Sequence, residues 1–464
     1  MAMSAPLTEY EKLRLENMKR NQVMIDALRI DSAKSEMHHL YAGPYANRRA
    51  GQWRKEDLVA LRRSRRSTRV NPTAEHRQGI GSSTSCMKPV QPTLAVEHTK
   101  QSLPLATVCI RGSSNTDLLS QLQDIDENAP LSSLPCMKKF SEGAAIEPSR
   151  FSLQKRDIAR VVPERITSAS FLPTSEHLFL AAGDKLGHLG FWDVESNDPE
   201  GDGLHIYRPH LMPLSGIAFP AFHATKVLTC SYDQTVKLLD VQTATFKVMY
   251  CSDKEEIVSA ICSVPGNPSC VFIAEGPGCL KMLDMRENRH SLNAEAHRMT
   301  INTIDVNLHS PWLVVTSSTD LKVKVWDVRK LDNTYRSLCS LSHQKAVHSA
   351  QFSPSGKAIV TCSYDNTVAL ANTSCKQQRF IAHANMHLRG VSSIRAIWGW
   401  DDRFVFVGNI KRSIDIISAK FEIECEWLTS PLMKSIPSRL AVHPYRPGLL
   451  AGCSSSGEVY LWSQ

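Results

Sequence analysis

The chain has 464 residues, of which 42% are hydrophobic, 7% aromatic and 22% charged, and its formal net charge is +8. This composition suits a β-rich protein with a polar extension, and the absence of any run of 18 apolar residues argues against a membrane-spanning helix. Met1 to Lys12 lacks the apolar core of a secretory signal, and the 13 cysteines include no C-x-x-C pair or zinc-type spacing. We therefore expect an intracellular protein with reduced thiols, no metal and no cofactor.

The first 150 residues form an extension of changing composition. Thr8 and Glu11 make a capping box, and the good helix formers that follow predict a charged helix over residues 8–30. A basic cluster with seven Lys/Arg covers 54–69, and residues 71–150 are rich in Ser, Pro, Thr and Gly, which predicts disorder. Residues 1–70 hold 15 Lys/Arg against eight Asp/Glu, a balance that favours an acidic partner such as nucleic acid, although it could also serve solubility.

From residue 151 onward, one pattern repeats: an alternating apolar strand ends on a large residue, usually before an acidic or polar one. The seven equivalent positions are 43 to 47 residues apart, at Trp192, Leu239, Leu283, Trp326, Ala371, Ile417 and Trp462. A period near 45 residues with Trp-Asp endings is typical of a WD-type propeller with four strands in each blade. The sequence therefore predicts an all-β, seven-bladed propeller over 151–464.

Short alternating segments between turn residues mark the first strand of each predicted blade. These segments are 166–171, 214–219, 257–262, 301–306, 347–352, 394–398 and 438–442. The sequence after Trp462 holds only two further residues, so the seventh blade needs its fourth strand from elsewhere. Residues 156–162 alternate in the same way and are predicted to supply it.

Strand direction alternates within a blade, so the loop entering the first strand shares a face with the hairpin between the second and third strands. This first face is predicted to carry a ring of cations that binds DNA phosphates at one mouth of the central channel. Its members are Lys185, Arg208, Arg298, Lys345, Arg389, Lys411 and Arg412. The alternative is scattered solvated charge, diluted by Asp184, Asp233, Asp320 and Asp365 of the hairpins. His210, His297, His343 and His383 occupy positions expected to bond within the blades rather than to hold metal.

The opposite face is predicted to carry a docking site. Asp284 with Arg286, and Asp327 with Arg329, place an arginine two residues after an aspartate that ends a third strand. We expect the aspartate to fix the turn and the arginine fork to point outward. Turn formation alone is the alternative explanation.

Residues 314–329, VVTSSTDLKVKVWDVR, resemble the sixteen-residue box of WD proteins that act as substrate receptors of cullin-4 ubiquitin ligases. The resemblance implies that Arg329 docks the ligase adaptor. Arg286 lies in a weaker copy of the box that departs from it at Glu275 and Pro277.

The chain as a whole resembles the WD repeat-containing protein 76 family, relatives of the damage-specific DNA-binding protein 2. The resemblance rests on short segments such as VVPERI at 161–166, AAGDK at 181–185, RPH at 208–210 and RAIW at 395–398. It implies a nuclear DNA-binding protein, with Lys185, Arg208, Lys345 and Arg389 facing DNA. Gly390 stands where the family usually places Trp, which leaves Met386 and Leu388 for any base insertion. The resemblance thus supports phosphate binding more than damage recognition by insertion.

Two other classes of function are weighed against DNA binding. A nuclear protein-interaction scaffold could use the basic residues 62–69 only for nuclear import. An enzyme is not expected, because the sequence has no P-loop, no G-x-S-x-G and no H-E-x-x-H motif. The expected partners are DNA, the cullin-4 ligase adaptor and other nuclear proteins.

Overall fold

The computed structural model describes residues 101–112, 146–175, 177–196, 202–220, 226–287, 289–331, 336–385, 393–419 and 425–464. The chain divides into two units, Met1–Met87 and Lys88–Gln464, and all described residues belong to the second. The predicted helix 8–30 and basic cluster 54–69 lie outside the described residues. Within the described ranges, no helix is long and apolar enough to span a membrane.

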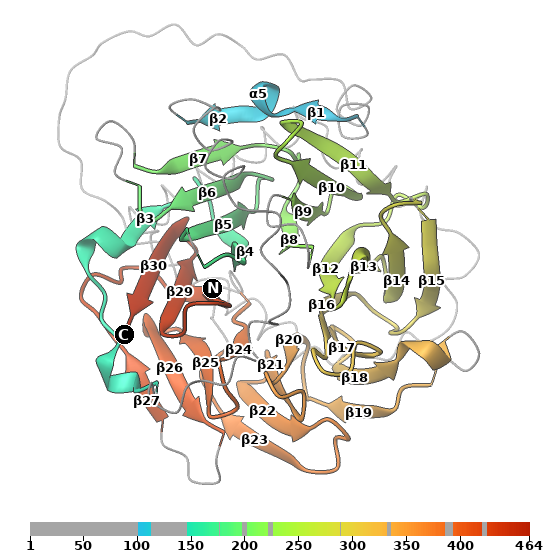
Figure 1. The fold of residues 1–464 in the computed structure, drawn as a ribbon. Coiled ribbons are helices and arrows are strands. Elements are labelled where there is room, and N and C mark those ends of the chain that lie inside the picture. Colours follow the sequence, from blue (N-terminus) through green and yellow to red (C-terminus); the bar gives the residue numbers. More distant parts are fainter. Residues whose placement is uncertain are drawn as a thin grey trace, which may run out of the picture. The chain divides into compact units, whose positions relative to one another are not determined.

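The described strands form seven antiparallel sheets that follow one another as the blades of a propeller (Figure 1). Blade 1 contains β4 (Ile166–Phe171), β5 (Phe179–Asp184), β6 (Leu189–Asp193) and β7 (Leu204–Tyr207). Blade 2 contains β8 (Leu214–Ala218), β9 (Lys226–Ser231), β10 (Thr235–Asp240) and β11 (Thr245–Cys251). Blade 3 contains β12 (Val258–Val264), β13 (Asn267–Glu275), β14 (Cys279–Asp284) and β15 (Arg289–Glu295).

The other four blades repeat this order. Blade 4 contains β16 (Ile301–Val306), β17 (Leu313–Ser318), β18 (Lys322–Asp327) and β19 (Cys339–Ser342), with the 3-10 turn η4 (Val328–Lys330) after β18. Blade 5 contains β20 (Val347–Phe352), β21 (Ala358–Ser363), β22 (Thr367–Asn372) and β23 (Gln378–Ala382). Blade 6 contains β24 (Ala396–Trp398), β25 (Phe404–Asn409), β26 (Ser413–Ser418) and β27 (Cys425–Leu428). Blade 7 contains β28 (Pro437–Val442), β29 (Leu449–Ser454) and β30 (Glu458–Ser463). The predicted seven-bladed propeller is confirmed, and so are its first strands to within one or two residues at most ends.

The core lies between the blades rather than inside any one of them. The buried apolar residues described fall into seven clusters, and each cluster joins two neighbouring blades, including blade 7 to blade 1. Phe179 and Tyr207 of blade 1, for example, pack with Leu239 and Phe246 of blade 2. Both faces of a central strand such as β6 are therefore buried, which explains its continuous apolar sequence. Burial between blades makes the ring, not the blade, the stable unit.

The ring closes as the sequence predicts. Strand β3 (Ile158–Arg160) pairs antiparallel with β30 and supplies the fourth strand of blade 7. The backbone N–H of Val161 donates to the carbonyl of Gly457 at 3.0 Å. Gly457 has φ of +83°, and a Cβ there would lie 1.9 Å from the carbonyl oxygen of Val162, so only glycine fits this closing turn.

The prediction of disorder over 71–150 is wrong for residues 103–111. Strand β1 (Leu103–Pro104), helix α5 (Leu105–Val108) and strand β2 (Cys109–Arg111) lie along the outer strands β11 and β7 (Figure 1). The unpaired edges of these outer strands accept the additional strands, and Leu105, only 1% exposed, enters the cluster between blades 1 and 2. An average composition over 80 residues hides such a short apolar segment.

The folded region also begins before the predicted domain boundary at residue 150. Ile146 is buried among residues of blades 6 and 7, and the short turns η2 (Pro148–Arg150) and η3 (Lys155–Asp157) lead from it toward β3. Residues 71–100 and 113–145 lie outside the described part of the chain.

Candidate functional site

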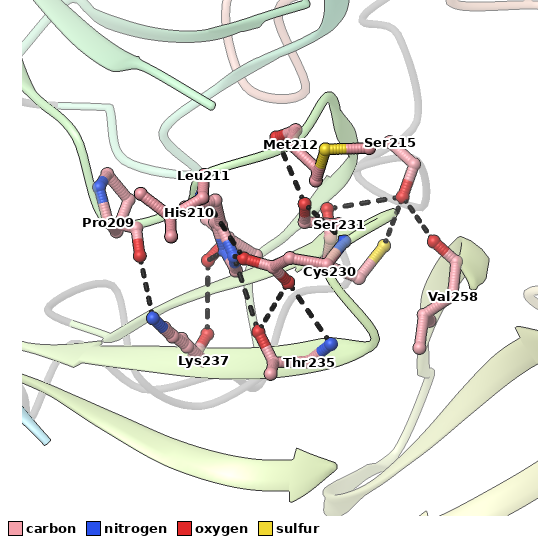
Figure 2. Close-up of polar contacts among 12 residues, drawn as sticks. Pro209, His210, Leu211, Met212, Ser215, Cys230, Ser231, Thr235, Lys237 and Val258 are labelled. Carbon is pink, nitrogen blue, oxygen red and sulfur yellow. Dashed lines mark hydrogen bonds and ion pairs between the residues drawn. The ribbon is translucent and has the colours of Figure 1, made fainter. Parts of the chain in front are cut away.

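A histidine and an aspartate hold the loops of the first face in blade 2. His210 Nδ1 lies 2.8 Å from Asp233 Oδ2, and its Nε2 lies 2.9 Å from Thr229 Oγ1 (Figure 2). Asp233 also accepts from the backbone N–H and the hydroxyl of Thr235. Burial alone would raise the pKa of Asp233, but His210, Thr235 and the nearby Lys237 outweigh it and hold that pKa at about 2.

Other blades repeat this arrangement. His297 lies 2.9 Å from Asp320, and His343 lies 3.5 Å from Asp365. His383 departs from it, because its Nδ1 contacts Asn385 and its Nε2 lies 3.0 Å from Asp415 of β26. The structural role predicted for the four histidines is confirmed by these contacts. Within the described ranges, no group of His, Cys, Asp and Glu is arranged to hold a metal ion.

These contacts bury the carboxylates of the second-to-third hairpins. The side chains of Asp184, Asp233, Asp320 and Asp365 are 0%, 4%, 10% and 5% exposed. They hold backbone and histidine donors inside the turns instead of facing solvent. These carboxylates therefore present little exposed surface beside the cations, although their charge remains within the turns.

Six of the seven predicted cations are exposed on loops of the first face. Lys185, Lys411 and Arg412 lie in second-to-third hairpins. Arg208, Arg298 and Lys345 lie in the loops entering blades 2, 4 and 5. Arg389 lies outside the described residues. The topology places the described six on the same face, as predicted from strand order.

Two of these cations have a local partner for the charged group, and the loop of a third is held by its backbone. Lys185 Nζ lies 2.8 Å from a carboxylate oxygen of Glu164, so part of its charge is already compensated. Lys345 Nζ lies 5.9 Å from the ring centre of Tyr364. The backbone N–H of Arg208 donates to the carbonyl of Val108, which fastens this loop to helix α5. Lys185 is consequently the weakest candidate for contact with an external anion.

Sequence reasoning missed three cations and one predominantly acidic loop on this face. Lys322 begins β18 at the hairpin of blade 4, Lys434 lies in the loop entering blade 7, and both are exposed. The loop entering blade 3 instead exposes Asp253 and Glu255 with Lys254 between them, and the half-buried Glu256 follows, so this loop is negative overall. The cations thus form an arc that is interrupted at blade 3. The same rule of strand order would have found all of these residues if it had been applied to every loop.

Apolar side chains accompany the cations, and the sequence alone did not single them out. Five are 41% to 51% exposed: Leu186, Leu211, Met212, Met299 and Leu321. Leu186 and Met299 directly follow Lys185 and Arg298, and Leu321 directly precedes Lys322. The first face therefore offers charge together with apolar surface, a combination suited to a ligand with phosphates and flat apolar groups.

The opposite face carries the predicted aspartate–arginine turns. Asp327 accepts from the backbone N–H of Arg329 at 3.2 Å, from its Nε at 2.9 Å and from its Nη2 at 2.8 Å. Two of the side-chain nitrogens of Arg329 thus donate to Asp327, while the rest of the guanidinium group remains exposed. The guanidinium carbon lies 4.5 Å from the ring centre of Trp312, a residue that the sequence did not single out. Arg329 is nevertheless 58% exposed and held in one orientation.

The second turn is looser. Arg286 donates to Asp284 from Nε at 3.4 Å and from Nη2 at 3.2 Å, and its side chain is 72% exposed. No aromatic ring among the described residues lies beneath its guanidinium. The better-ordered turn belongs to blade 4, as the sequence had indicated.

Comparisons with known proteins agree with this architecture. Residues 287–327 and 335–371 match the family model described as WD domain, G-beta repeat. The chain is 27% identical to WD repeat-containing protein 76 of Xenopus laevis, with 98% of this chain and 80% of that protein aligned. It is 25% identical to the protein of the same name from Mus musculus, over 98% of this chain and 74% of the relative. It is also 23% identical to DNA damage-binding protein CMR1 of Scheffersomyces stipitis, over 99% of this chain and the whole relative.

Proposed function

The chain is a WD-repeat propeller protein homologous to WD repeat-containing protein 76, and from this premise we propose that it binds DNA through the first face of the propeller. The proposed role is connected with DNA damage, as the name of the CMR1 relatives suggests, and we propose the nucleus as its place because the DNA lies there. One observation carries the proposal: exposed cations occupy the loops of one face while the hairpin carboxylates of that face are buried.

The arc from blade 4 to blade 7 is the strongest part of this surface. It holds Arg298, Lys322, Lys345, Lys411 and Lys434, and histidine–aspartate contacts fix the loops of the first three in blades 4 and 5. Cations held on rigid loops follow the phosphate backbone without reading the base sequence. The acidic loop entering blade 3 repels phosphates, so the bound strand is expected to avoid that blade.

The experiment compares the full chain with a double variant, Arg298→Glu with Lys345→Glu, in binding to a short duplex across a salt series. Each contacted phosphate contributes about 0.9 to the slope of log K against log salt. Loss of two contacts should therefore make the slope shallower by about 2 and weaken binding most at low salt. An intact duplex and a lesion-containing duplex are measured side by side, so that any preference for damage is seen directly.

The matched control is Lys357→Glu with Lys376→Glu. These two lysines are exposed on turns of blade 5 that lie on the opposite face, and the change in net charge is the same. The control should keep the parental slope. Equal slopes in both double variants and the parent would refute DNA binding by the first face, and the scaffold function would then be the better explanation.

We further propose that the opposite face docks the adaptor of a cullin-4 ubiquitin ligase through Arg329. The support is the combination of an exposed guanidinium, an aspartate that fixes it and Trp312 beneath it. Planar arginine groups held in this way are frequent anchors of protein interfaces. In both proposals the protein binds and presents partners and performs no catalysis of its own.

A further inference from the structure

The first strands of neighbouring blades contact one another around the axis of the propeller, and their second residues are equivalent. Six strands have a register irregularity at this position, where Thr167, Ser215, Ser259, Asn302, His348 and Ser438 stand. Thr167, Ser215, Ser259 and Asn302 donate to a backbone carbonyl of the next blade. Short polar side chains thus form a hydrogen bond between each pair of neighbouring blades from blade 1 to blade 5.

In blade 5 the second position holds His348, and in blades 6 and 7 an arginine stands at the start of the first strand, although blade 7 keeps Ser438 at the second position. His348 stands at the second position of β20, Arg395 directly precedes β24, and Arg439 is the third residue of β28. The backbone N–H of Arg395 donates to Ser438, which places the two arginines on adjoining segments of blades 6 and 7.

The two arginines are held by neutral groups only. Arg439 donates from Nε to the Thr167 carbonyl at 2.7 Å and from Nη2 to the Ser393 hydroxyl at 3.0 Å, and so bridges blades 6 and 1. Arg395 Nη2 reaches the Asn302 carbonyl in blade 4 at 3.4 Å. Neither arginine forms an ion pair with a carboxylate of the described residues.

Two buried nitrogens of this cluster lack any hydrogen-bond partner among the described residues: Arg395 Nε and His348 Nε2. His348 lies in β20, which contacts β24 next to Arg395. Arg165 directly precedes β4, which contacts β28 with Arg439. Burial and then the charges of Arg439 and Arg395 lower the pKa of His348 to about 4, which keeps it neutral at pH 7. Burial and then Arg395 and Arg165 also lower the pKa of Arg439. A buried polar group without a partner is rare, and a buried charge without a counter-ion is costly.

We propose that Arg395 and Arg439, with His348 and Arg165 beside them, bind a phosphate-sized oxyanion at the inner ring of strands. A phosphate group suits the cluster because it is anionic and offers several acceptors to guanidinium forks and to a neutral imidazole N–H. The site lies on the inner strands, whereas the proposed DNA contacts lie on the loops. The proposal does not depend on DNA binding by the first face.

The test titrates the full chain with inorganic phosphate in a phosphate-free buffer at constant ionic strength, following the melting temperature and the heat of binding. A saturable rise of about 2–4 °C is expected once phosphate exceeds its Kd tenfold. Arg395→Gln should abolish the rise, whereas Lys376→Gln, at an exposed turn on the opposite face, should keep it. The general stabilisation that phosphate gives all proteins does not saturate and would be shared by every variant.

Two results would overturn the proposal: no saturable rise in the parent, or the same saturable rise in Arg395→Gln. If Arg395→Gln fails to fold, the heat of phosphate binding to the parent decides the question. The titration extends to about 10 mM phosphate, which is ten times a millimolar Kd. If no heat of binding is measured over this range, the site is rejected. A short duplex added at saturation distinguishes the source of the phosphate. Displacement of inorganic phosphate supports a site for a strand phosphate, and simultaneous binding supports a site for a free anion.

Discussion

Acid sensitivity of the propeller should depend on single buried histidines, and His443 offers the sharpest case. Its side chain is fully buried, and its Nδ1 accepts from the backbone N–H groups of Tyr445 at 3.1 Å and Arg446 at 2.9 Å. Protonation of Nδ1 would break both hydrogen bonds. Burial first, and then the positive charge of Arg446, lower the pKa of His443 to about 4.

The coupling between protonation of His443 and folding sets the sign and the size of the change in stability with pH. The unfolded chain binds a proton at His443 below pH 6.5, whereas the folded chain resists protonation down to about pH 4. The contribution of His443 to stability is therefore complete above pH 6.5 and is lost as the pH falls toward 4. At pH 5 the loss at this one position is about 2 kcal/mol of the free energy of unfolding.

The assay measures the free energy of unfolding in urea at pH 7 and pH 5. His443→Asn keeps an acceptor near the position of Nδ1 but cannot titrate, so its loss between the two pH values should be smaller than that of the parent by about 2 kcal/mol. His290→Asn, at an exposed position of β15, serves as the control and should behave as the parent does. If the parent and His443→Asn lose the same stability, His443 does not carry this part of the acid sensitivity and the argument fails.

Three further predictions concern the strand segment at 103–111 and the two faces. Leu105→Ala should lower the free energy of unfolding by about 2–5 kcal/mol, because Leu105 is buried between blades 1 and 2; a change within experimental error would show that β1 and β2 do not contribute to stability. Arg329→Ala should reduce co-purification of the cullin-4 ligase adaptor while the salt slope of DNA binding stays parental; undiminished recovery would exclude Arg329 from docking. Lys322→Glu with Lys434→Glu should make the salt slope of DNA binding shallower by about 2, and an unchanged slope would restrict the surface to the cations predicted from the sequence.

The fold was predictable because its signals are local and repeated. Alternation of apolar residues specifies each strand, and the spacing from Trp192 to Trp462 specifies the number of blades. Strand order then assigns each loop to a face without any coordinates, which is why the described cations were placed correctly. The segment around Leu105 escaped this reasoning because a two-residue and a three-residue strand carry no period, and only the open edges of β7 and β11 stabilise them.

The sequence by itself determined the seven blades, their closing strand and the face on which each loop lies. Only the tertiary structure decided that Asp233 and its equivalents are buried, that Arg329 folds back over Trp312, and that Arg395 and Arg439 come together on the inner strands. The physical reason is the distance along the chain at which these contacts form. Arg439 donates to Thr167, 272 residues away, and that contact exists only because the blades close into a ring.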